Sequence, residues 1–335
     1  MPVSAAVVER YYSRGWYASL QPVLTAVSNR VPFALFDPLV AAVLVTLVAT
    51  WVQAWRHPGG AWPRVGGALS LTVGMVASLY LVFLATWGLN YRREPVWRHV
   101  AFDESRVTRT SIESMASRAV AELNRLHPTA HRASWPDGNA LVRAMAPAFA
   151  AVQGELGLAH AATPGAPKPT VFGPYFRWTS VSGMIDPFFL EVMLTPDALP
   201  FERPALLAHE WGHLAGFAHE AEAGFVGWVT AMRAGEQAQY SAWLDLYPRL
   251  TAALPTDTRA RLDRALAEGP RSDYRAIARR LAKASPRLQR VAWQGYDGFL
   301  KANRVAEGVA SYDRVVTLVV GTRFGDGWTL GAAGS

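Results

Sequence analysis

The stretch from Ala208 to Glu222 contains a His-Glu-x-x-His motif, in which His209 and His213 are four residues apart. On an α-helix this spacing places both imidazoles on one face, where they can bind the same metal ion. Glu210 is rotated by about 100° from His209, which suits a general base that acts on a metal-activated water. The motif therefore predicts a Zn²⁺-dependent hydrolase with Glu210 as its base.

A catalytic zinc takes three protein ligands and one water, so a third ligand is needed. Gly216 lets the chain turn back after His213, and three residues then follow that could reach the metal: His219, Glu220 and Glu222. His219 would complete the metzincin spacing, but a strong helical pattern follows it and the Met-containing turn is not recognisable. The two glutamates also suit a helix start without any metal, because carboxylates favour that end of the helix dipole.

Two other histidines have the same spacing of four, His127 and His131. Pro128 lies between them and argues against one continuous helix. We therefore expect both to be surface residues, as we do for His160, which has no neighbouring partner in the sequence.

The helix that carries the motif is preceded by prolines, of which Pro204 suits the first helical turn. We expect the helix to end near Gly216. Two runs before it resemble strands, Thr170–Phe172 and Phe188–Leu194. In zincin folds an edge strand in this place pairs with extended substrate backbone, and a short structural hairpin is the alternative interpretation.

Most of the remaining chain has helical apolar spacing. Before the strand-like runs it predicts helices at 111–126, ended by Pro128, and at about 137–156. After the motif it predicts helices at about 220–233, 236–253, 257–268, 271–284, 286–302 and 304–321. The expected fold is therefore mainly α with a small β element.

Two long uncharged runs lie in the first hundred residues. Val31 to Trp55 contains Asp37 as its one charge, and Val65 to Tyr91 contains none. A bilayer requires about 20 apolar residues, so the runs predict a transmembrane helical hairpin at about 31–55 and 65–91. Trp87 and Tyr91 would end the second span, with Arg93 just outside it.

The charges around these runs also fit a membrane anchor. Eight arginines oppose only three acidic residues in the first hundred positions, and the arginines flank the uncharged runs. Residues 1–30 mix aromatic and charged side chains and predict an interfacial helix, with an ordinary helix packed on the domain as the alternative. We expect a multi-pass cell-membrane protein in contact with the lipid bilayer.

A hairpin places residues 1–30 and 92–335 on the same side of the membrane. Arg56 and Arg64 lie close together in the connecting loop, while the outer flanks hold more arginines in total. Large domains translocate largely regardless of charge. We favour the extracytoplasmic side for the catalytic domain.

Composition and the absence of certain motifs argue against several other classes of protein. There are no cysteines, which excludes disulfides, thiolate zinc sites and cysteine nucleophiles. The net charge of +7 resides mostly in the first hundred residues and forms no basic stripe, so nucleic acid is not an expected partner. No Gly-x-Ser-x-Gly elbow or phosphate loop is present, so serine hydrolases and nucleotide-binding enzymes have no support.

Several segments together resemble the bacterial domain-of-unknown-function 3810 family of membrane proteins. These segments are Tyr11-Tyr12-Ser13, Val31-Pro32-Phe33 with Asp37, Trp87-Gly88-Leu89-Asn90-Tyr91, the stretch 208–225, and Tyr296 to Val320. The resemblance covers nearly the whole chain, and the family's biochemistry is itself unassigned. It implies a Glu-x-Glu-Ala run after the motif and no requirement for histidine at position 219.

The run from Glu220 to Gly224 also resembles the Glu-x-x-Ala-Asp/Asn element of several membrane and regulatory zinc peptidases. There the first Glu binds the metal, and the residue four positions later orients a ligand. Gly224 stands at that later position and has no side chain to do so. On this resemblance we rank Glu220 first as the third ligand, followed by Glu222 and His219.

Zincins often use a Tyr, His or Arg to stabilise the oxyanion of the tetrahedral intermediate. Tyr312 and Tyr296 lie in segments that resemble the family's C-terminal element, and we rank Tyr312 first. A half-buried structural tyrosine is the alternative role.

The sequence therefore predicts a membrane anchor over 1–100 and a zincin-like metallopeptidase domain over 101–335. The expected activity is hydrolysis of a peptide or protein substrate by a gluzincin-like zinc site. The alternative is a catalytically inactive zincin-like scaffold or signalling protein, with a structural metal or none. Intact His209, Glu210 and His213 argue for activity.

Overall fold

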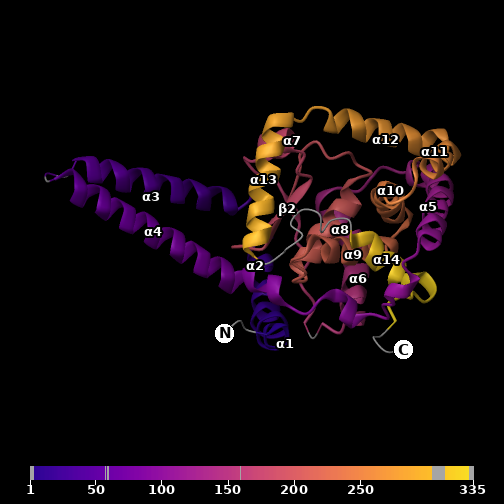
Figure 1. The fold of residues 1–335 in the computed structure, drawn as a ribbon, viewed down its shortest axis with the longest axis horizontal. Coiled ribbons are helices and arrows are strands. Elements are labelled where there is room, and N and C mark those ends of the chain that lie inside the picture. Colours follow the sequence, from indigo (N-terminus) through magenta and orange to yellow (C-terminus); the bar gives the residue numbers. More distant parts are fainter. Residues whose placement is uncertain (1–3, 57, 59, 159, 304–313, 332–335) are drawn as a thin grey trace.

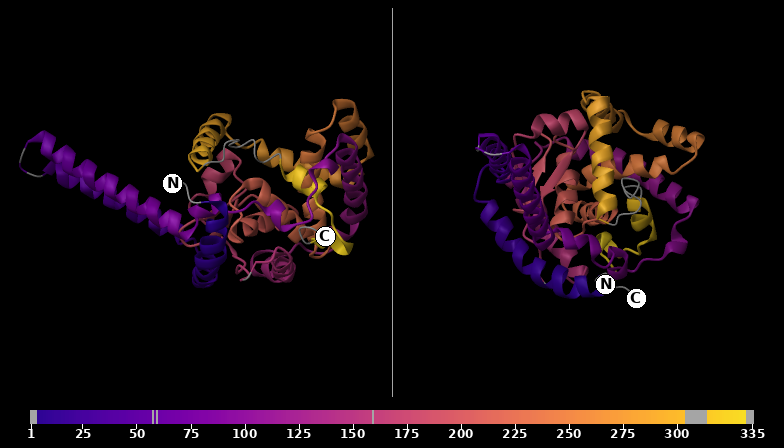
Figure 2. Two further views of the ribbon diagram at one scale, coloured as in Figure 1. Left: turned by 60° about the horizontal axis from the view of Figure 1, so that its bottom comes forward. Right: turned by 60° about the vertical axis from the view of Figure 1, so that its left-hand side comes forward.

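A computed structural model describes residues 4–56, 58, 60–158, 160–303 and 314–331, apart from the side chains at 299, 300 and 302. The protein is mainly helical, as predicted, and consists of a helical body from which two long helices project (Figure 1). Further views show the same arrangement from other sides (Figure 2).

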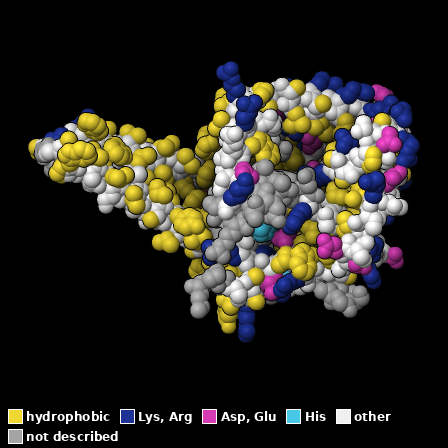
Figure 3. Space-filling model, viewed as in Figure 1, with side chains coloured by type: hydrophobic (Ala, Val, Ile, Leu, Met, Phe, Trp, Pro, Cys, Tyr) yellow, Lys and Arg dark blue, Asp and Glu magenta, His cyan; other side chains and the backbone are white. Residues whose placement is uncertain are grey.

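The projecting pair consists of α3 (Phe36–Arg56) and α4 (Ala61–Thr86), which are antiparallel neighbours. Within the described part of the chain, these two helices are long and apolar enough to cross a membrane. No residue of α3 is buried, and only Ala68 and Phe83 of α4 are. The surface of the pair is accordingly covered by hydrophobic side chains, whereas charged side chains gather at the opposite end of the body (Figure 3).

The second apolar helix ends earlier than the sequence suggested. The chain leaves α4 at Thr86 and continues through three short 3₁₀ turns, η2 (Gly88–Arg92), η3 (Val96–His99) and η4 (Glu104–Arg106). Trp87 and Tyr91, expected at the membrane interface, are buried in the body. Arg93, expected just outside the span, is buried in an ion pair with Glu9. Tertiary packing offers these side chains a core and a carboxylate that a local pattern cannot reveal.

The N-terminal segment packs on the body through one face. It comprises α1 (Ala5–Val7), the π-helix η1 (Val8–Trp16) and α2 (Tyr17–Ser28). Val8, Tyr12 and Tyr17 belong to the core that also holds the motif helix, whereas Tyr11 and Trp16 are exposed. The first hundred residues therefore contribute to the core of the body as well as forming the projecting pair.

Two helices form the centre of the body, α8 (Arg203–Leu214) and α9 (Glu220–Met232). α9 is apolar on all sides after its first turn, so it is buried along nearly its whole length. The two helices approach each other closely at Gly227. An ideal Cβ on Gly227 would lie only 2.6 Å from the backbone nitrogen of His209. A side chain at position 227 would push α9 away from the motif.

The other helices surround this pair (Figure 1). Those in contact with it are α6 (Gly138–Glu155), α10 (Glu236–Ala252), α14 (Arg314–Gly321) and the C-terminal 3₁₀ turn η6 (Asp326–Trp328), which packs on α9. Farther out lie α5 (Arg109–Ala130), which packs on α10, and α11 (Thr256–Ala265), α12 (Glu268–Leu281) and α13 (Pro286–Ala302). Each helix predicted from apolar spacing is present with its ends shifted by a few residues. Of the last one, predicted at about 304–321, the part 304–313 lies outside the described residues and α14 is the remainder.

Helix α5 was predicted to stop before Pro128, but it continues to Ala130. Proline removes one backbone N–H donor and clashes with the preceding turn. Here it lies in the last turn, where only two residues follow, so little of the helix is disturbed. As a result His127 and His131 lie one turn apart.

A small sheet lies beside α8, in the order β1 (Pro167–Lys168), β3 (Glu191–Leu194) and β2 (Gly183–Asp186). β1 is parallel and β2 antiparallel to β3, with Gly183 opposite Leu194. β2 is the edge strand next to α8, and neither β2 nor the preceding helix α7 (Gly173–Thr179) was predicted.

The two strand predictions were only partly correct. Thr170–Phe172 is not a strand, because the Asp37 carboxylate accepts hydrogen bonds from the Val171 N–H and the Thr170 hydroxyl and holds this segment as a turn. The run Phe188–Leu194 forms a strand only from Glu191 onward. The Asp186 carboxylate accepts from the N–H groups of the two phenylalanines that begin the run, at 3.0 and 2.7 Å.

Candidate metal centre

Helix α8 presents His209 and His213 on one face, as the spacing of four predicts. The helix begins at Arg203, with Pro204 in its first turn. The two imidazole rings lie 4.9 Å apart in an edge-to-face arrangement. His213 is buried, and His209 retains partial exposure.

The end of α8 orients His213. Gly216 adopts a positive φ of 86°, and the Phe217 N–H donates to the Gly212 carbonyl while the Gly216 N–H donates to the His213 carbonyl. This is the glycine-dependent helix ending known as the Schellman motif. It returns the Phe217 carbonyl to 2.8 Å from His213 Nδ1, which can then donate to it and direct Nε2 the other way.

Three side chains from the first hundred residues hold the last carbonyls of α8. The Tyr17 hydroxyl donates to the Leu214 carbonyl at 2.8 Å, and the Arg93 guanidinium donates to the Ala215 carbonyl at 3.1 Å. The Trp87 indole N–H lies 3.5 Å from the His213 carbonyl. The segments on either side of the projecting pair thus fix the helix end that carries His213.

Glu220 is the first residue of α9 and points back at both histidines. Its Oε2 lies 3.1 Å from His209 Nε2 and 3.5 Å from His213 Nε2. The possible ligand atoms of these three residues all lie within 4.8 Å of one another. We call His209, His213 and Glu220 the candidate metal centre.

The electrostatics of this centre favour a positive charge between the three residues. Burial alone would raise the pKa of Glu220, but the imidazoles of His213 and His209 hold it well below its usual range. Burial alone would lower the pKa of His213, but the Glu220 carboxylate raises it to about 9. A cation in this position, whether a proton or a metal ion, is therefore stabilised. Two imidazoles and one carboxylate are also the protein ligands of many catalytic zinc sites, so the residues present fit a zinc ion.

Glu210 lies on α8 beside the centre and is buried. Burial raises its pKa, although the nearby imidazoles of His209 and His213 oppose this effect. The edge strand β2 passes next to it, since an ideal Cβ on Gly183 would lie 2.5 Å from Glu210 Oε1. The structure therefore places Glu210 between the motif helix and the backbone of β2, a contact that the sequence did not reveal.

The two alternative third ligands point elsewhere. Glu222 accepts a hydrogen bond from the Val96 N–H at 3.0 Å, and its burial raises its pKa. His219 lies at the N-cap of α9 with its ring against Tyr91, at 6.0 Å between centroids. Of the three candidates, Glu220 is the one that the structure brings to the histidines.

Gly224 stands at the position where the Glu-x-x-Ala-Asp/Asn element of zinc peptidases carries a side chain that orients a ligand. An ideal Cβ there would lie 3.7 Å from His209 Nδ1 but only 2.8 Å from Val315 Cγ2 of α14. The position thus faces His209, and Val315 occupies the space that a larger side chain would need.

Tyr296, on α13, donates a hydrogen bond from its hydroxyl to Glu220 Oε1. The sequence ranked Tyr312 ahead of it, and Tyr312 lies outside the described residues. Tyr296 is separated from Glu220 by 76 residues, so no local signal shows this contact.

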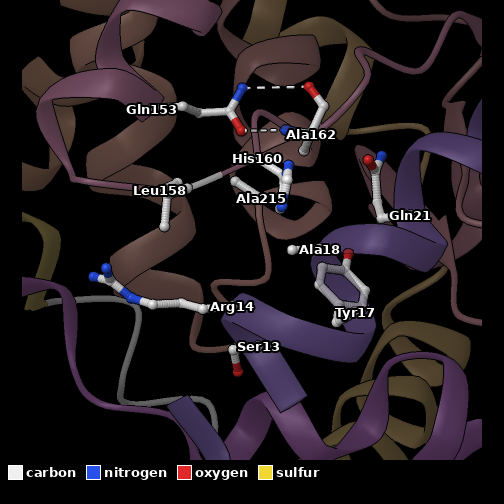
Figure 4. A pocket seen from close by; sticks show the side chains of 10 residues that line it. All are labelled: Ser13, Arg14, Tyr17, Ala18, Gln21, Gln153, Leu158, His160, Ala162 and Ala215. Atoms are coloured by element: carbon white, nitrogen blue, oxygen red, sulfur yellow. Dashed lines mark hydrogen bonds between the residues drawn. The ribbon is translucent and has the colours of Figure 1, made fainter. Parts of the chain in front are cut away.

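A small cavity lies between η1, α2 and the loop after α6 (Figure 4). Its volume is about 10 Å³, enough for about one water molecule. Tyr17, Gln21, Gln153 and His160 are among its lining residues, and the Gln153 side chain bonds the backbone of Ala162. This cavity contains none of the candidate metal ligands and is too small for a substrate.

The fold and the site define a class of protein: a mainly helical body with a His-His-Glu centre on two consecutive helices, joined to a helical pair long and apolar enough to cross a membrane. Within that class, the chain belongs to the family described as Protein of unknown function (DUF3810), whose model matches residues 12–320. This confirms the family resemblance seen in the sequence. No match was found among curated proteins or among solved structures.

Proposed function

We propose that this protein is a membrane-anchored, zinc-dependent metalloprotease. The observation that carries the proposal is the approach of Glu220 Oε2 to the Nε2 atoms of His209 and His213, at 3.1 and 3.5 Å. These residues would hold Zn²⁺, which when bound supplies Lewis-acid activation of water and polarises the substrate carbonyl.

The chain's own residues supply the proton transfers. Glu210 lies buried beside the centre, where it takes a proton from the attacking water and passes it to the leaving amine. Because burial raises its pKa, the carboxyl is suited to hold that proton between the two steps. Tyr296, whose hydroxyl reaches Glu220, is the described tyrosine placed to donate a hydrogen bond at the centre.

The edge strand β2 supports an extended peptide as the substrate. Among the described strands, β2 pairs with β3 alone, which leaves its other edge available for strand addition. Its first residue, Gly183, lies against Glu210. A peptide added to β2 would therefore run past the general base.

The proposed substrates are membrane-associated, because the site lies near the end of α4. Trp87 follows the last residue of α4 directly, and its ring lies 6.1 Å from that of His213. If α3 and α4 span the bilayer, the centre is close to the membrane surface. Lipid and a membrane-bound or surface protein are then the proposed partners, with the catalytic domain on the extracytoplasmic side.

The first test is the zinc content and activity of the full-length protein purified in detergent. Glu210→Gln should retain zinc and lose casein cleavage by about 10²- to 10⁴-fold, because it removes the proton acceptor. Glu268→Gln is the matched control, since Glu268 is an exposed carboxylate on α12. Chelator should abolish cleavage by the wild type.

The outcomes separate the proposal from its alternative. Active Glu210→Gln protein would refute the mechanism. Protein that binds zinc but cleaves nothing would instead support a zincin-like scaffold with a structural metal. Protein that binds no zinc would refute the metal site itself.

A further inference from the structure

A second group of metal-binding side chains lies away from the candidate metal centre, where α5 meets α12. His127 and His131 occupy the last turn of α5 and its C-cap, and their rings stack at 4.3 Å with an angle of 27°. Both direct Nε2 at one oxygen of Asp273 on α12. His131 Nε2 lies 2.9 Å and His127 Nε2 3.8 Å from Asp273 Oδ2.

Asp273 is buried, and a third helix, α10, also contacts its carboxylate. Its Oδ2 also accepts a hydrogen bond from the Tyr240 hydroxyl of α10 at 2.5 Å. In the described part of the chain, the ion pairs of Asp273 are with these two imidazoles, which carry charge only when protonated. A buried carboxylate is costly unless a positive charge accompanies it. A divalent cation would supply that charge while both imidazoles stay neutral.

The donor atoms have the spacing that one metal ion requires. All three lie within 4.8 Å of one another. Two donors of a tetrahedral zinc ion, with bonds of about 2.0 to 2.1 Å, are about 3.3 Å apart. The observed separations of 2.9 and 3.8 Å lie on either side of this value. Both histidines retain some exposure, so solvent can provide the fourth donor.

The surroundings also keep the rings in place. Trp135, Phe201 and Tyr240 pack around the His131 ring, at 5.4 to 5.7 Å between centroids. On the other side, an ideal Cβ on Gly269 would lie 2.4 Å from the His127 ring, so the absence of a side chain lets α12 approach it. Ordered rings of this kind lose little conformational freedom when they bind a metal.

We propose that His127, His131 and Asp273 form a second divalent-metal site, which takes Zn²⁺ and ties the end of α5 to α12. The sequence predicted no such site because it expected Pro128 to separate the two histidines. Asp273 is more than 140 residues away from both. The site shares no residue with the candidate metal centre, so it does not depend on the proposed protease activity.

The test measures zinc per chain in full-length protein after dialysis. Wild type should hold about two zinc ions, and both Asp273→Asn and the double variant His209→Asn/His213→Asn about one. Asp273→Asn keeps the side-chain shape and an oxygen that accepts from Tyr240. Tyr240→Phe is the control, because it removes a hydrogen bond of the cluster and leaves all three metal donors.

A second readout does not need the Asp273 variant to fold. Added zinc should raise the melting temperature of His209→Asn/His213→Asn, and cobalt should give it a visible d–d absorption. Tyr240→Phe should melt at a lower temperature yet retain its zinc. If the double histidine variant binds neither metal, or if Asp273→Asn holds as much zinc as wild type, the cluster is a hydrogen-bonded network and the proposal is wrong.

Discussion

Two glutamates of the same helix turn have opposite environments. Glu220 lies between the Nε2 atoms of two histidines, while Glu222 accepts from the backbone of Val96. Two residues correspond to a rotation of about 200° on a helix, so the two carboxylates must point in nearly opposite directions. Which of them faces the motif depends on how α9 rotates against α8.

Replacing each glutamate should separate their roles. Glu220→Gln should weaken zinc binding by at least about 100-fold, because it removes an anionic ligand. Glu222→Gln should leave zinc affinity within about threefold of wild type, since the amide oxygen can still accept from the Val96 N–H. Zinc titration with a competing chelator measures both. If the two variants lose zinc affinity equally, or if Glu222→Gln loses more, Glu220 is not the third ligand.

At the scale of elements, the motif helix is held by its own ending and by the segments before and after α3 and α4. Gly216 forms the turn that brings the Phe217 carbonyl to His213. Arg93 bonds the Ala215 carbonyl, stacks on the Phe217 ring and pairs with Glu9. The orientation of His213 thus depends on a glycine turn and on a buried ion pair.

Gly216→Ala should destabilise the protein by about 1 to 2 kcal/mol, because a side chain is unfavourable at a φ of 86°. The added Cβ would also lie 2.9 Å from Arg93 Nη1. Zinc affinity should fall as well, as the Phe217 carbonyl shifts from His213. Gly235→Ala is the control, since no atom of the described residues lies within 4 Å of a Cβ at Gly235 and its φ is −66°. Similar melting temperatures for the two variants would contradict this account.

The Glu9–Arg93 pair should make stability depend on acid pH. Burial alone would raise the pKa of Glu9, but the Arg93 guanidinium lowers it below the ordinary value for a glutamate. A carboxyl with a depressed folded pKa contributes stability above its unfolded pKa, and this contribution disappears as the pH falls through the folded pKa.

Glu9→Gln should therefore cost about 3 kcal/mol at neutral pH, because Arg93 remains buried without its partner. The difference in melting temperature from wild type should shrink as the pH is lowered from 7 to below 4. Glu94→Gln is the control, since Glu94 pairs with the more exposed Arg98 and should change stability by less than about 1 kcal/mol. A difference between wild type and Glu9→Gln that stays constant with pH would exclude this contribution.

At the scale of the whole molecule, the projecting pair and the body are separable, but the first hundred residues are not. α3 buries no residue in the body, whereas Tyr12, Tyr17 and Trp87 lie in its core. Asp37 holds the turn at Thr170 and should stay with the body. The pair therefore has the form of an insertion into a body that needs the segments on both sides of it.

Replacing residues 40–80 with a flexible linker should give a protein that no longer associates with membranes and still binds zinc. Deleting residues 1–100 should abolish zinc binding, because the bonds from Tyr17 and Arg93 to the end of α8 are lost. Flotation with lipid vesicles and zinc analysis measure the two effects. Vesicle binding by the shortened protein, or zinc binding by the deletion, would contradict this division of roles.

Local periodicity accounts for what the sequence alone could predict. A period of 3.6 residues placed His209 and His213 on one face, and the same period located the helices from α5 to α13, except for α7, within a few residues. The length of the uncharged runs identified α3 and α4 as apolar helices. These properties depend on residues that are neighbours in the chain, so no knowledge of packing is required.

Contacts between distant segments had to come from the tertiary structure. Glu220, rather than Glu222, faces the histidines because of how α9 packs on α8. Tyr296 reaches Glu220 across 76 residues, and Asp273 meets His131 across 142. Asp186 and Asp37 capture backbone N–H groups and turn two expected strand segments into bends. The sequence thus determined the motif and the helices. Packing determined which glutamate faces the histidines, where the edge strand lies and how the second cluster forms, since nothing local encodes which distant surfaces meet.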